Sequence, residues 1–344
     1  MKQFWPLLII VFAPIFSFAQ IDTSALKVSG YVDFYFSYDF NSFKPSNNPG
    51  FLYSYNRRNQ VGMNLALLKM SYRKGAAQVN VVLQSGSFVN GNDYLYQPIQ
   101  ELNLEVDLNK QKTLSIKTGV FTSHLGFESA IGADNVCLSQ SLVSENSPYF
   151  LFGSMLNFNP NNKIEMGLVV SNGWYVFPRE YEDNGIAIGS FISYRPSKSF
   201  KIYWATYNDI NKRFYNNFYT QLSIDKLKLT LGFDYGQDIW EPNRTDFWYV
   251  PTSIIQFEIN EKIKLGVRGE YFYDERNRII STPLPYPSKT AIFGFSSNID
   301  YRITDNVLFR LESRNFNSNY DYFPKDGSLA SNNNNITASI SARF

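Results

Sequence analysis

The sequence has 344 residues, a formal net charge of +2 and an aromatic fraction of 17%, with 24 Tyr and 30 Phe. The balanced charge argues against a nucleic-acid partner, and the single cysteine, Cys137, excludes an internal disulfide framework. Beyond Gln20 no stretch approaches the roughly 18 consecutive apolar residues that a transmembrane helix needs. Because Tyr and Trp favour sites that are apolar at one end and wet at the other, this composition suits a barrel with a lipid face and a water face.

The first 19 residues have the layout of a cleavable secretory signal. Residues 1–3 carry one positive charge, and residues 4–18 are almost wholly apolar but too few to span a membrane as a helix. Ser17 and Ala19 place small side chains at the two positions that a signal peptidase reads before Gln20. We therefore expect export, cleavage after Ala19 and a mature chain of residues 20–344. An uncleaved N-terminal anchor is the alternative.

Alternation of apolar and polar residues dominates the mature part of the chain. Residues 227–235, 263–271 and 101–108 each place apolar side chains at every second position, which is typical of strands with one apolar and one polar face. Such runs begin near residues 28, 61, 77, 101, 114, 149, 164, 186, 202, 218, 228, 254, 264, 291, 307 and 336. We predict about 16 strands, with an uncertainty of about two, each long enough to cross a bilayer at a tilt.

Short and mostly long connections alternate between these runs. The short ones are turn-like and lie at residues 74–75, 109–110, 159–162, 196–199, 225–226, 260–261 and 304–306. The others lie at residues 39–58, 88–98, 123–147, 173–184, 210–215, 237–247, 274–288 and 317–333. An outer-membrane barrel has short periplasmic turns and long outer loops, whereas a soluble β-sandwich has no reason to segregate them. The fold class we predict is therefore all-β, a transmembrane antiparallel up-and-down barrel with both termini on the periplasmic side.

Two local features refine this expectation. Residues 65–72 break the alternation, and a β-bulge there would restore it. The last nine residues alternate again and end in Phe344, which resembles the assembly signal read by the outer-membrane insertion machinery. The partners expected for the barrel itself are therefore this machinery and outer-membrane lipid.

The polar faces of the predicted strands carry many charges. Barrels of about 16–18 strands enclose an aqueous channel, and a charged side chain facing lipid costs about 2–4 kcal/mol near the midplane. The charged residues that we expect to line the pore, or to pair with one another inside it, are Asp33, Glu101, Glu105, Asp107, Lys117, Glu165, Lys228, Asp234, Lys264, Arg268, Glu270, Arg310, Glu312 and Arg314. Because the acidic strand at 101–107 lies across the barrel from the strands that carry the arginines, we also predict a transverse field with weak overall selectivity.

Residues 119–152 carry a series of short motifs, namely GVF at 119–121, SHLGFES at 123–129, DN at 134–135, SQS at 139–141 and ENSPY at 145–149. With the opening strand at 30–41 and NGW at 172–174, this series resembles the β-barrel porin-2 family, the OmpL-like outer-membrane proteins of Bacteroidota. The resemblance implies a multi-pass porin in the outer membrane of a Gram-negative bacterium. It does not imply a particular solute, and the second half of the chain carries fewer of its motifs.

By the same resemblance, the third long loop is a candidate constriction, because in porins this loop often folds into the pore. It spans residues 123–147, and Glu128, Asp134 and Glu145 are its candidate titratable residues. A structureless loop of this length is uncommon and is usually functional. An outward loop that packs on its neighbours is the alternative.

The function that we expect is passive diffusion of small hydrophilic solutes or ions. A closed barrel that acts as a surface receptor or adhesin through its long loops is the alternative. Catalysis is not expected, because the single histidine, His124, follows Ser123 directly and neighbouring strand residues point to opposite faces. No cofactor is expected either, since one His and one Cys do not supply a usual zinc site. Outward aromatic residues such as Tyr194, Trp204 and Tyr301 fit membrane-interface girdles or contacts in a homo-oligomer.

Overall fold

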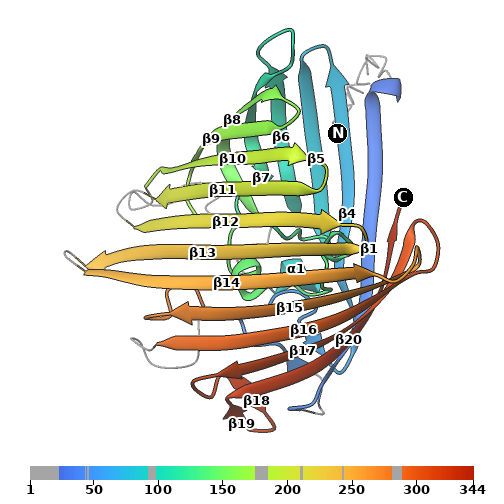
Figure 1. The fold of residues 1–344 in the computed structure, drawn as a ribbon, viewed down its shortest axis with the longest axis vertical. Coiled ribbons are helices and arrows are strands. Elements are labelled where there is room, and N and C mark those ends of the chain that lie inside the picture. Colours follow the sequence, from blue (N-terminus) through green and yellow to red (C-terminus); the bar gives the residue numbers. More distant parts are fainter. Residues whose placement is uncertain are drawn as a thin grey trace, which may run out of the picture.

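The computed structural model describes residues 23–42, 44, 46–91, 98–174, 185–209, 212–241, 244–280 and 289–344. Within these residues sixteen strands form one closed antiparallel barrel, in which each strand pairs with its neighbours along the chain (Figure 1). No helix in the described part of the chain is long and apolar enough to cross a membrane. The predicted signal at residues 1–19 lies outside the described residues.

The barrel strands confirm the predicted count and chain order. They are β1 (Leu26–Asp39), β4 (Val61–Lys74), β5 (Ala77–Ser85), β6 (Ile99–Asp107), β7 (Leu114–Thr122), β8 (Phe150–Asn161), β9 (Ile164–Ser171), β10 (Ala187–Ser197), β11 (Phe200–Asp209), β12 (Arg213–Ile224), β13 (Leu227–Glu241), β14 (Arg244–Glu258), β15 (Ile263–Asp274), β16 (Thr290–Arg302), β17 (Val307–Ser318) and β20 (Asn332–Arg343). Two small hairpins pair β2 (Ser46–Asn47) with β3 (Arg57–Arg58) and β18 (Phe323–Lys325) with β19 (Ser328–Ala330). The short helices are η1 (Thr23–Ala25), α1 (Ser87–Asn90), η3 (Gly132–Asp134) and α2 (Leu142–Glu145).

Two of the predicted connections, at 210–215 and 237–247, are shorter in the structure than predicted. The strand β12 covers residues 213–215 of the first segment, and β13 and β14 cover residues 237–241 and 244–247 of the second. The cause is that the polar residues there face inward and pair across strands. Arg213 stands directly opposite Asp238, and the two form an ion pair at 2.6 Å. The polar run that suggested a loop is therefore the inner face of an extended strand pair.

The predicted bulge lies one residue before the segment proposed for it. The register between β1 and β4 shifts at Asn64, which is the extra residue on β4. Its side-chain oxygen accepts a hydrogen bond of 2.8 Å from the backbone N–H of Tyr55. The bulge thus turns a polar side chain inward to hold the first long loop.

The two faces of the strands explain why the barrel forms in lipid. On β15 the side chains of Leu265 and Val267 point outward and are exposed, whereas Arg268 and Glu270 point inward and are buried. The same alternation runs around the barrel, so its outer face is largely apolar and its interior is polar. Closure of the sheet also leaves none of the unpaired strand edges that hydrocarbon does not tolerate.

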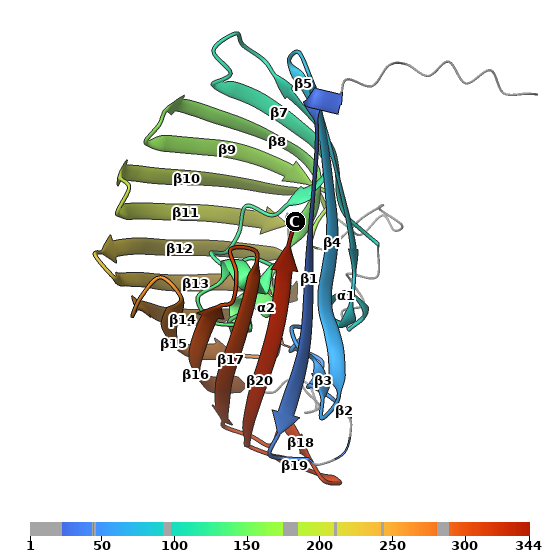
Figure 2. The same ribbon diagram turned by 90° about the vertical axis from the view of Figure 1, so that its right-hand side faces the viewer.

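The strand β1 closes the barrel against β20, the last strand of the chain (Figure 2). At this seam the hydroxyl groups of Ser37 and Thr337 lie 2.8 Å apart. The N–H of Gly30 donates to the carbonyl of Phe344 at 2.9 Å, and the N–H of Arg343 donates to Asn306 in a tight turn at 3.0 Å. Both ends of the described chain therefore lie at the end of the barrel that holds the tight turns, which is the periplasmic end in barrels of this kind.

Candidate functional site

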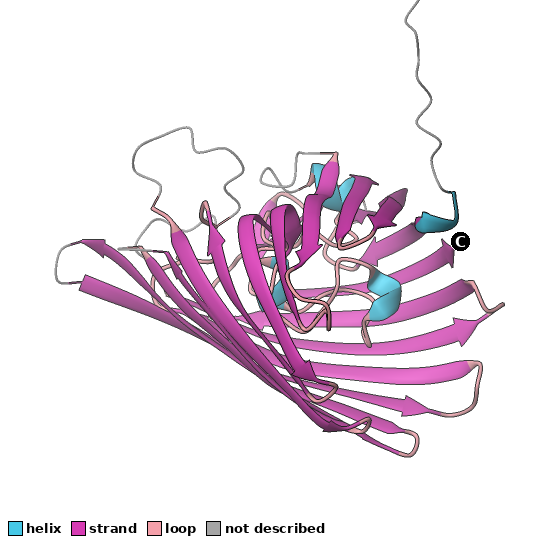
Figure 3. Ribbon diagram, turned by 90° about the horizontal axis from the view of Figure 1, so that it is seen from above, coloured by secondary structure: helices cyan, strands magenta, loops and turns pink. Residues whose placement is uncertain are grey.

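The connection between β7 and β8, residues 123–149, lies inside the barrel, and we call it the lumen loop. It passes along the inner wall of β11 and β12, where His124 Nε2 lies 2.8 Å from the carbonyl of Thr206 and the N–H of Gly126 donates to Asn217 at 3.1 Å. It then crosses to β15, β16 and β17. Figure 3, seen from above, has loop segments and short helices within the ring of strands.

Arg268 on β15 is the first of three arginines that hold the lumen loop. Its guanidinium forms an ion pair with Glu128 at 3.1 Å and donates to the carbonyl of Ser139 at 2.7 Å. It also donates to the hydroxyl of Ser296 on β16 at 3.1 Å. The Arg268 side chain is fully buried, so this contact joins the wall to the loop without water between them.

Arg310 on β17 holds the middle of the lumen loop through hydrogen bonds to the backbone of the loop. The guanidinium donates to the carbonyls of Gly132 at 2.5 Å, Asn135 at 3.0 Å and Val136 at 2.8 Å. A 2.6 Å ion pair with Asp300 on β16 orients it. The planar guanidinium has several donors in a fixed geometry, and it can therefore bond to three carbonyls and a carboxylate at the same time.

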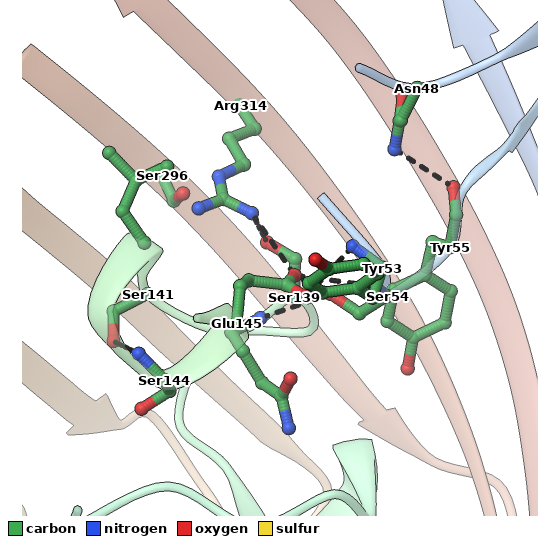
Figure 4. A network of polar contacts seen from close by, with 12 residues as sticks. Asn48, Tyr53, Ser54, Tyr55, Ser139, Ser141, Ser144, Glu145, Ser296 and Arg314 are labelled. Atoms are coloured by element: carbon green, nitrogen blue, oxygen red, sulfur yellow. Dashed lines mark hydrogen bonds and ion pairs between the residues drawn. The ribbon is translucent and has the colours of Figure 1, made fainter. Parts of the chain in front are cut away.

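Arg314, also on β17, lies among the carboxylates around α2 (Figure 4). It pairs with Glu270 at 3.0 Å and lies 3.9 Å from Glu145, the last residue of α2. Glu145 in turn accepts hydrogen bonds from the backbone N–H groups of Tyr53 and Ser54, both at 3.0 Å, and from the Ser54 hydroxyl. Burial raises the pKa of Glu145, and these donors and Arg314 oppose that rise. Glu145 therefore ties the first long loop to the lumen loop.

The wall carboxylates Glu270 and Glu312 complete the attachment. Glu270 accepts the N–H of Leu142 at 2.6 Å, and Glu312 accepts the N–H and the hydroxyl of Ser139, each at 2.6 Å. Five residues predicted to line the pore, namely Arg268, Glu270, Arg310, Glu312 and Arg314, are thus buried against the lumen loop. The predicted transverse field treated these arginines as charges facing water. The structure corrects that picture, because each is paired with a carboxylate.

Among the candidate loop residues, Asp134 differs from Glu128 and Glu145 in being exposed. It forms a 2.5 Å ion pair with Arg343 near the C-terminus. Two further predicted residues are buried in hydrogen-bonded sites. Asp33 accepts from the hydroxyl of Tyr55 at 2.6 Å, and Asp234 accepts from the amide of Asn217 at 2.7 Å.

The other predicted residues lie nearer to water, and all except Glu101 lie towards the tight-turn half of the barrel. Glu105 and Lys117 face each other on β6 and β7 with 3.4 Å between their charged groups. Lys264 pairs with Glu258 at 3.2 Å. Asp107 forms an ion pair with Arg73, and Glu101 accepts the hydroxyl of Thr122 at 2.6 Å. The last two residues, Lys228 and Glu165, are exposed at this end.

Three hollows lie beside the lumen loop. The end hollow, about 790 Å³, opens among the tight turns of β12 to β17 and has Asp134 and Asn135 in its wall. The loop hollow, about 400 Å³, lies between the lumen loop and the wall strands β4 and β6, and it shares these two residues. The side hollow, about 310 Å³, lies against β6 to β11 and shares Thr122 and Ser123 with the loop hollow. The three hollows therefore adjoin one another through shared wall residues.

The opposite end of the lumen is packed with apolar side chains. Phe51 of the first long loop lies against Phe323 of β18, with ring centroids 6.2 Å apart, and Phe316 on β17 stacks on Phe323 at 5.6 Å. Trp248 and Phe272 are buried in the same cluster. These five rings lie near the ends of the strands away from the tight turns, and the buried cluster continues from them to Phe191, Tyr203 and Tyr219.

The histidine has a structural position. Its Nε2 bonds to the Thr206 carbonyl, while Ser123 accepts the N–H of Leu125 at 3.2 Å. Burial lowers the pKa of His124 to about 4, so the ring is neutral at pH 7. In the part of the chain that the structure describes, no group of three or more His, Cys, Asp or Glu residues could hold a metal ion.

Sequence reasoning missed several inward residues beside the hollows, namely Lys69, Phe191, Lys201, Tyr203 and Tyr219. Lys69 lines the loop hollow, and Phe191 and Tyr203 line the side hollow. Their positions share the parity of the inward residues on their strands, and this signal was available in the sequence. The prediction of pore-lining residues considered only charged side chains, and it therefore omitted the aromatic rings.

Comparison with known proteins decides the family. A family model described as "Putative beta-barrel porin-2, OmpL-like" matches residues 25–344. The chain belongs to this family. The protein is a multi-pass outer-membrane barrel and a porin-like channel. No curated sequence matches it.

Solved structures match this family member in fold. The trimer form of OmpT from Vibrio cholerae is 8% identical, with 93% of this chain and 99% of that chain covered at a TM-score of 0.61. The outer-membrane channel DcaP of Acinetobacter baumannii is 9% identical, with 93% and 97% covered at 0.60. The anion-selective porin of Comamonas acidovorans is 8% identical, with 93% and 99% covered at 0.60. At these identities the likeness concerns the barrel fold.

Proposed function

We propose that this porin-like channel passes small hydrophilic solutes or ions by passive diffusion, with weak selectivity. The observation that carries the proposal is the position of the lumen loop. Arg268, Arg310 and Arg314 hold it to the wall formed by β15 and β17. The loop hollow and the side hollow lie on its other side, and the end hollow opens next to it among the tight turns. The loop acts in this view as the constriction, with Glu128, Asp134 and Glu145 as its charged residues.

The chemistry of the hollows supports weak selectivity. In the side hollow Glu105 forms an ion pair with Lys117. In the loop hollow Lys69 on β4 and Glu101 on β6 both stand opposite Val82 on the strand between them. Each hollow therefore offers groups of both signs to a passing ion. A channel so lined favours neither cations nor anions strongly. The proposal involves no catalysis and no cofactor.

The apolar cluster around Phe51 and Phe323 favours a second candidate function. It fills the lumen at the end where a surface loop would meet a partner. A barrel closed by this cluster would act as a receptor or adhesin through its long loops rather than as a channel.

Planar-bilayer conductance of the purified barrel separates the two functions. The channel proposal requires discrete single-channel currents and swelling of liposomes in sugar solutions. Replacing residues 130–140 by a short Gly-Ser linker removes the constriction, so we expect a several-fold rise in conductance. Val267→Ala, which changes the outer face of β15, serves as the control. A wild-type barrel that folds but carries no current and causes no swelling would establish the receptor function instead.

We further propose that the barrel contacts outer-membrane lipid over its apolar face and associates with copies of itself. On the outer face Trp204 donates to the side chain of Asn216 at 3.3 Å. An amide in an apolar band is better placed in a protein contact than in lipid. Mass measurement in detergent tests this, and Asn216→Leu should shift an oligomer towards single barrels. A wild-type protein that is only monomeric would contradict it.

A further inference from the structure

Four aromatic rings form a row along one inner wall, and we call them the aromatic row. They are Phe191 on β10, Tyr203 on β11, Tyr219 on β12 and Phe127 of the lumen loop. Phe191 stacks on Tyr203 with centroids 6.0 Å apart and planes 19° apart, and Tyr203 stacks on Tyr219 at 4.8 Å and 24°. Phe127 meets Tyr219 edge-on at 5.6 Å. The row follows from the register, because Tyr203 stands directly opposite Tyr219.

The aromatic row joins two of the hollows. Phe191 and Tyr203 form part of the wall of the side hollow, and Phe127 and Tyr219 form part of the wall of the loop hollow. Phe191, Tyr203 and Tyr219 are otherwise buried and stack on one another, so a solute that moves from one hollow to the other meets the exposed edges of aromatic rings in both. Each hollow has a volume in the range of about 300–1,000 Å³ that is typical of small-molecule sites.

Hydrogen-bonding groups border the rings. Lys201 Nζ donates to the hydroxyl of Tyr219 at 2.7 Å and lies 4.9 Å from the ring centroids of both Tyr203 and Tyr219. The hydroxyl groups of Thr122 and Ser123 belong to the wall shared by both hollows. Donors and acceptors thus lie beside an apolar surface along the same path.

Charged side chains of both signs line each hollow, namely Glu105, Glu165 and Lys117 in the side hollow and Lys69, Glu101, Glu128 and Asp134 in the loop hollow. Glu105 faces Lys117 at 3.4 Å in the side hollow, and Lys69 shares its row with Glu101 in the loop hollow. An anion or a cation is attracted by one member of each pair and repelled by the other. An uncharged solute with many hydroxyl groups can bond to both members at once.

We infer that the aromatic row and the two hollows form a binding track for short neutral saccharides. A sugar ring has an apolar C–H face that packs on aromatic rings and a rim of hydroxyl groups that donate and accept hydrogen bonds. The track offers both surfaces together and has acidic and basic groups along it. This inference rests on the proposed channel function and names its class of solute.

The test is the block of single-channel current by added maltose, with mannitol as a linear polyol of similar chemistry without a ring. In wild type we expect maltose to reduce the current with saturation and mannitol to reduce it only in proportion to viscosity. Tyr219→Leu and Phe191→Leu remove one ring each and keep an apolar side chain, so each should raise the half-blocking maltose concentration about tenfold. Phe218→Leu, which changes an outward ring on the same strand as Tyr219, is the matched control and should leave the block unchanged.

Several results would overturn the inference while the channel stands. They are normal conductance with no saturating block by maltose, an equal block by mannitol, or the same loss of block in Phe218→Leu as in the track variants. If the leucine variants yield no barrel, calorimetric titration of wild type in detergent decides, because heat of binding is expected for maltose and not for mannitol. A folded wild type without any conductance would instead contradict the proposed function itself.

Discussion

The guanidinium of Arg268 on the barrel wall lies 3.1 Å from the carboxylate of Glu128 in the lumen loop, and both side chains are buried. Glu128 also accepts the backbone N–H of Ser141 at 2.7 Å. The pair therefore fixes the loop to the wall and at the same time fixes the start of α2. A buried pair of this kind is costly to break, because one removed partner leaves the other charge without water.

Arg268→Ala should release the lumen loop. Loss of one partner of a buried ion pair costs about 3–5 kcal/mol, and the carbonyl of Ser139 loses its donor as well. We expect faster cleavage of the loop by added protease and a noisier, larger single-channel current. Lys264→Ala on the same strand is the control, since its pair with Glu258 is partly exposed and should matter little. Equal effects in the two variants would contradict an anchoring role.

Acid should weaken the docking of the lumen loop through His124. Its pKa is lowered by burial from an ordinary value of 6.5 to about 4, so the docked ring stays neutral while an undocked ring takes up a proton. Stability is therefore present above pH 6.5 and is lost as the pH falls towards 4, by about 3 kcal/mol in all. Loop cleavage measured between pH 7 and pH 4 should rise in wild type.

The matched variant for this prediction is His124→Gln, which keeps a donor for the Thr206 carbonyl and does not titrate. Glu145 opposes the effect, because its burial-raised pKa favours its protonated form in the docked loop as the pH falls. The difference between wild type and His124→Gln isolates the histidine. Identical pH profiles for the two proteins would refute the assignment.

Gly119→Ala should prevent stable folding. The backbone there has φ +124°, and a Cβ would lie 2.2 Å from the carbonyl oxygen of Leu102 on β6. Both the conformation and the contact exclude a side chain, so we expect a loss of more than about 1 kcal/mol and a lower urea midpoint. Gly269→Ala is the control, since nothing lies within 4 Å of its added Cβ.

Removal of the terminal ring should impair assembly. The ring of Phe344 covers Gly30, where an added Cβ would meet it at 2.0 Å. We expect Phe344→Ala to lower the fraction of folded barrel in the outer membrane by several-fold, as measured by heat-dependent mobility on gels. Phe309→Ala removes another outward ring, on β17, and should assemble normally. If both variants assembled equally well, Phe344 would have no role as a signal.

The sequence allowed the strands, their order and the tight turns to be predicted, because alternation is a local property. Lys228 and Leu229, for example, point to opposite faces whatever the rest of the chain does. The two loops predicted wrongly failed for a local reason as well. A charged residue such as Asp238 looks the same in a loop and on the inner face of a strand, and only its partner Arg213 on the next strand distinguishes them.

The site was less predictable, because its contacts are distant in the chain. Glu128 was singled out as a loop residue and Arg268 as a wall residue, but they are 140 positions apart and nothing local joins them. The hydrogen bonds from Arg310 to three backbone carbonyls could not be predicted from residue types, because every residue has a backbone carbonyl. The aromatic row was missed for a different reason. Tyr203 and Tyr219 have the parity of inward residues, but they carry no charge and were not considered as pore-lining residues.

The seam between β1 and β20 has a consequence for biogenesis. Ser37 and Thr337, whose hydroxyl groups meet there, are 300 residues apart, so the first strand cannot find its partner until nearly the whole chain has been delivered. Until then both outer strands present unpaired edges that attract other chains. Contacts of such long sequence separation also form slowly. The unclosed sheet therefore needs a chaperone in transit, and a chain cut short before residue 332 would remain an aggregation hazard however well its other strands had paired.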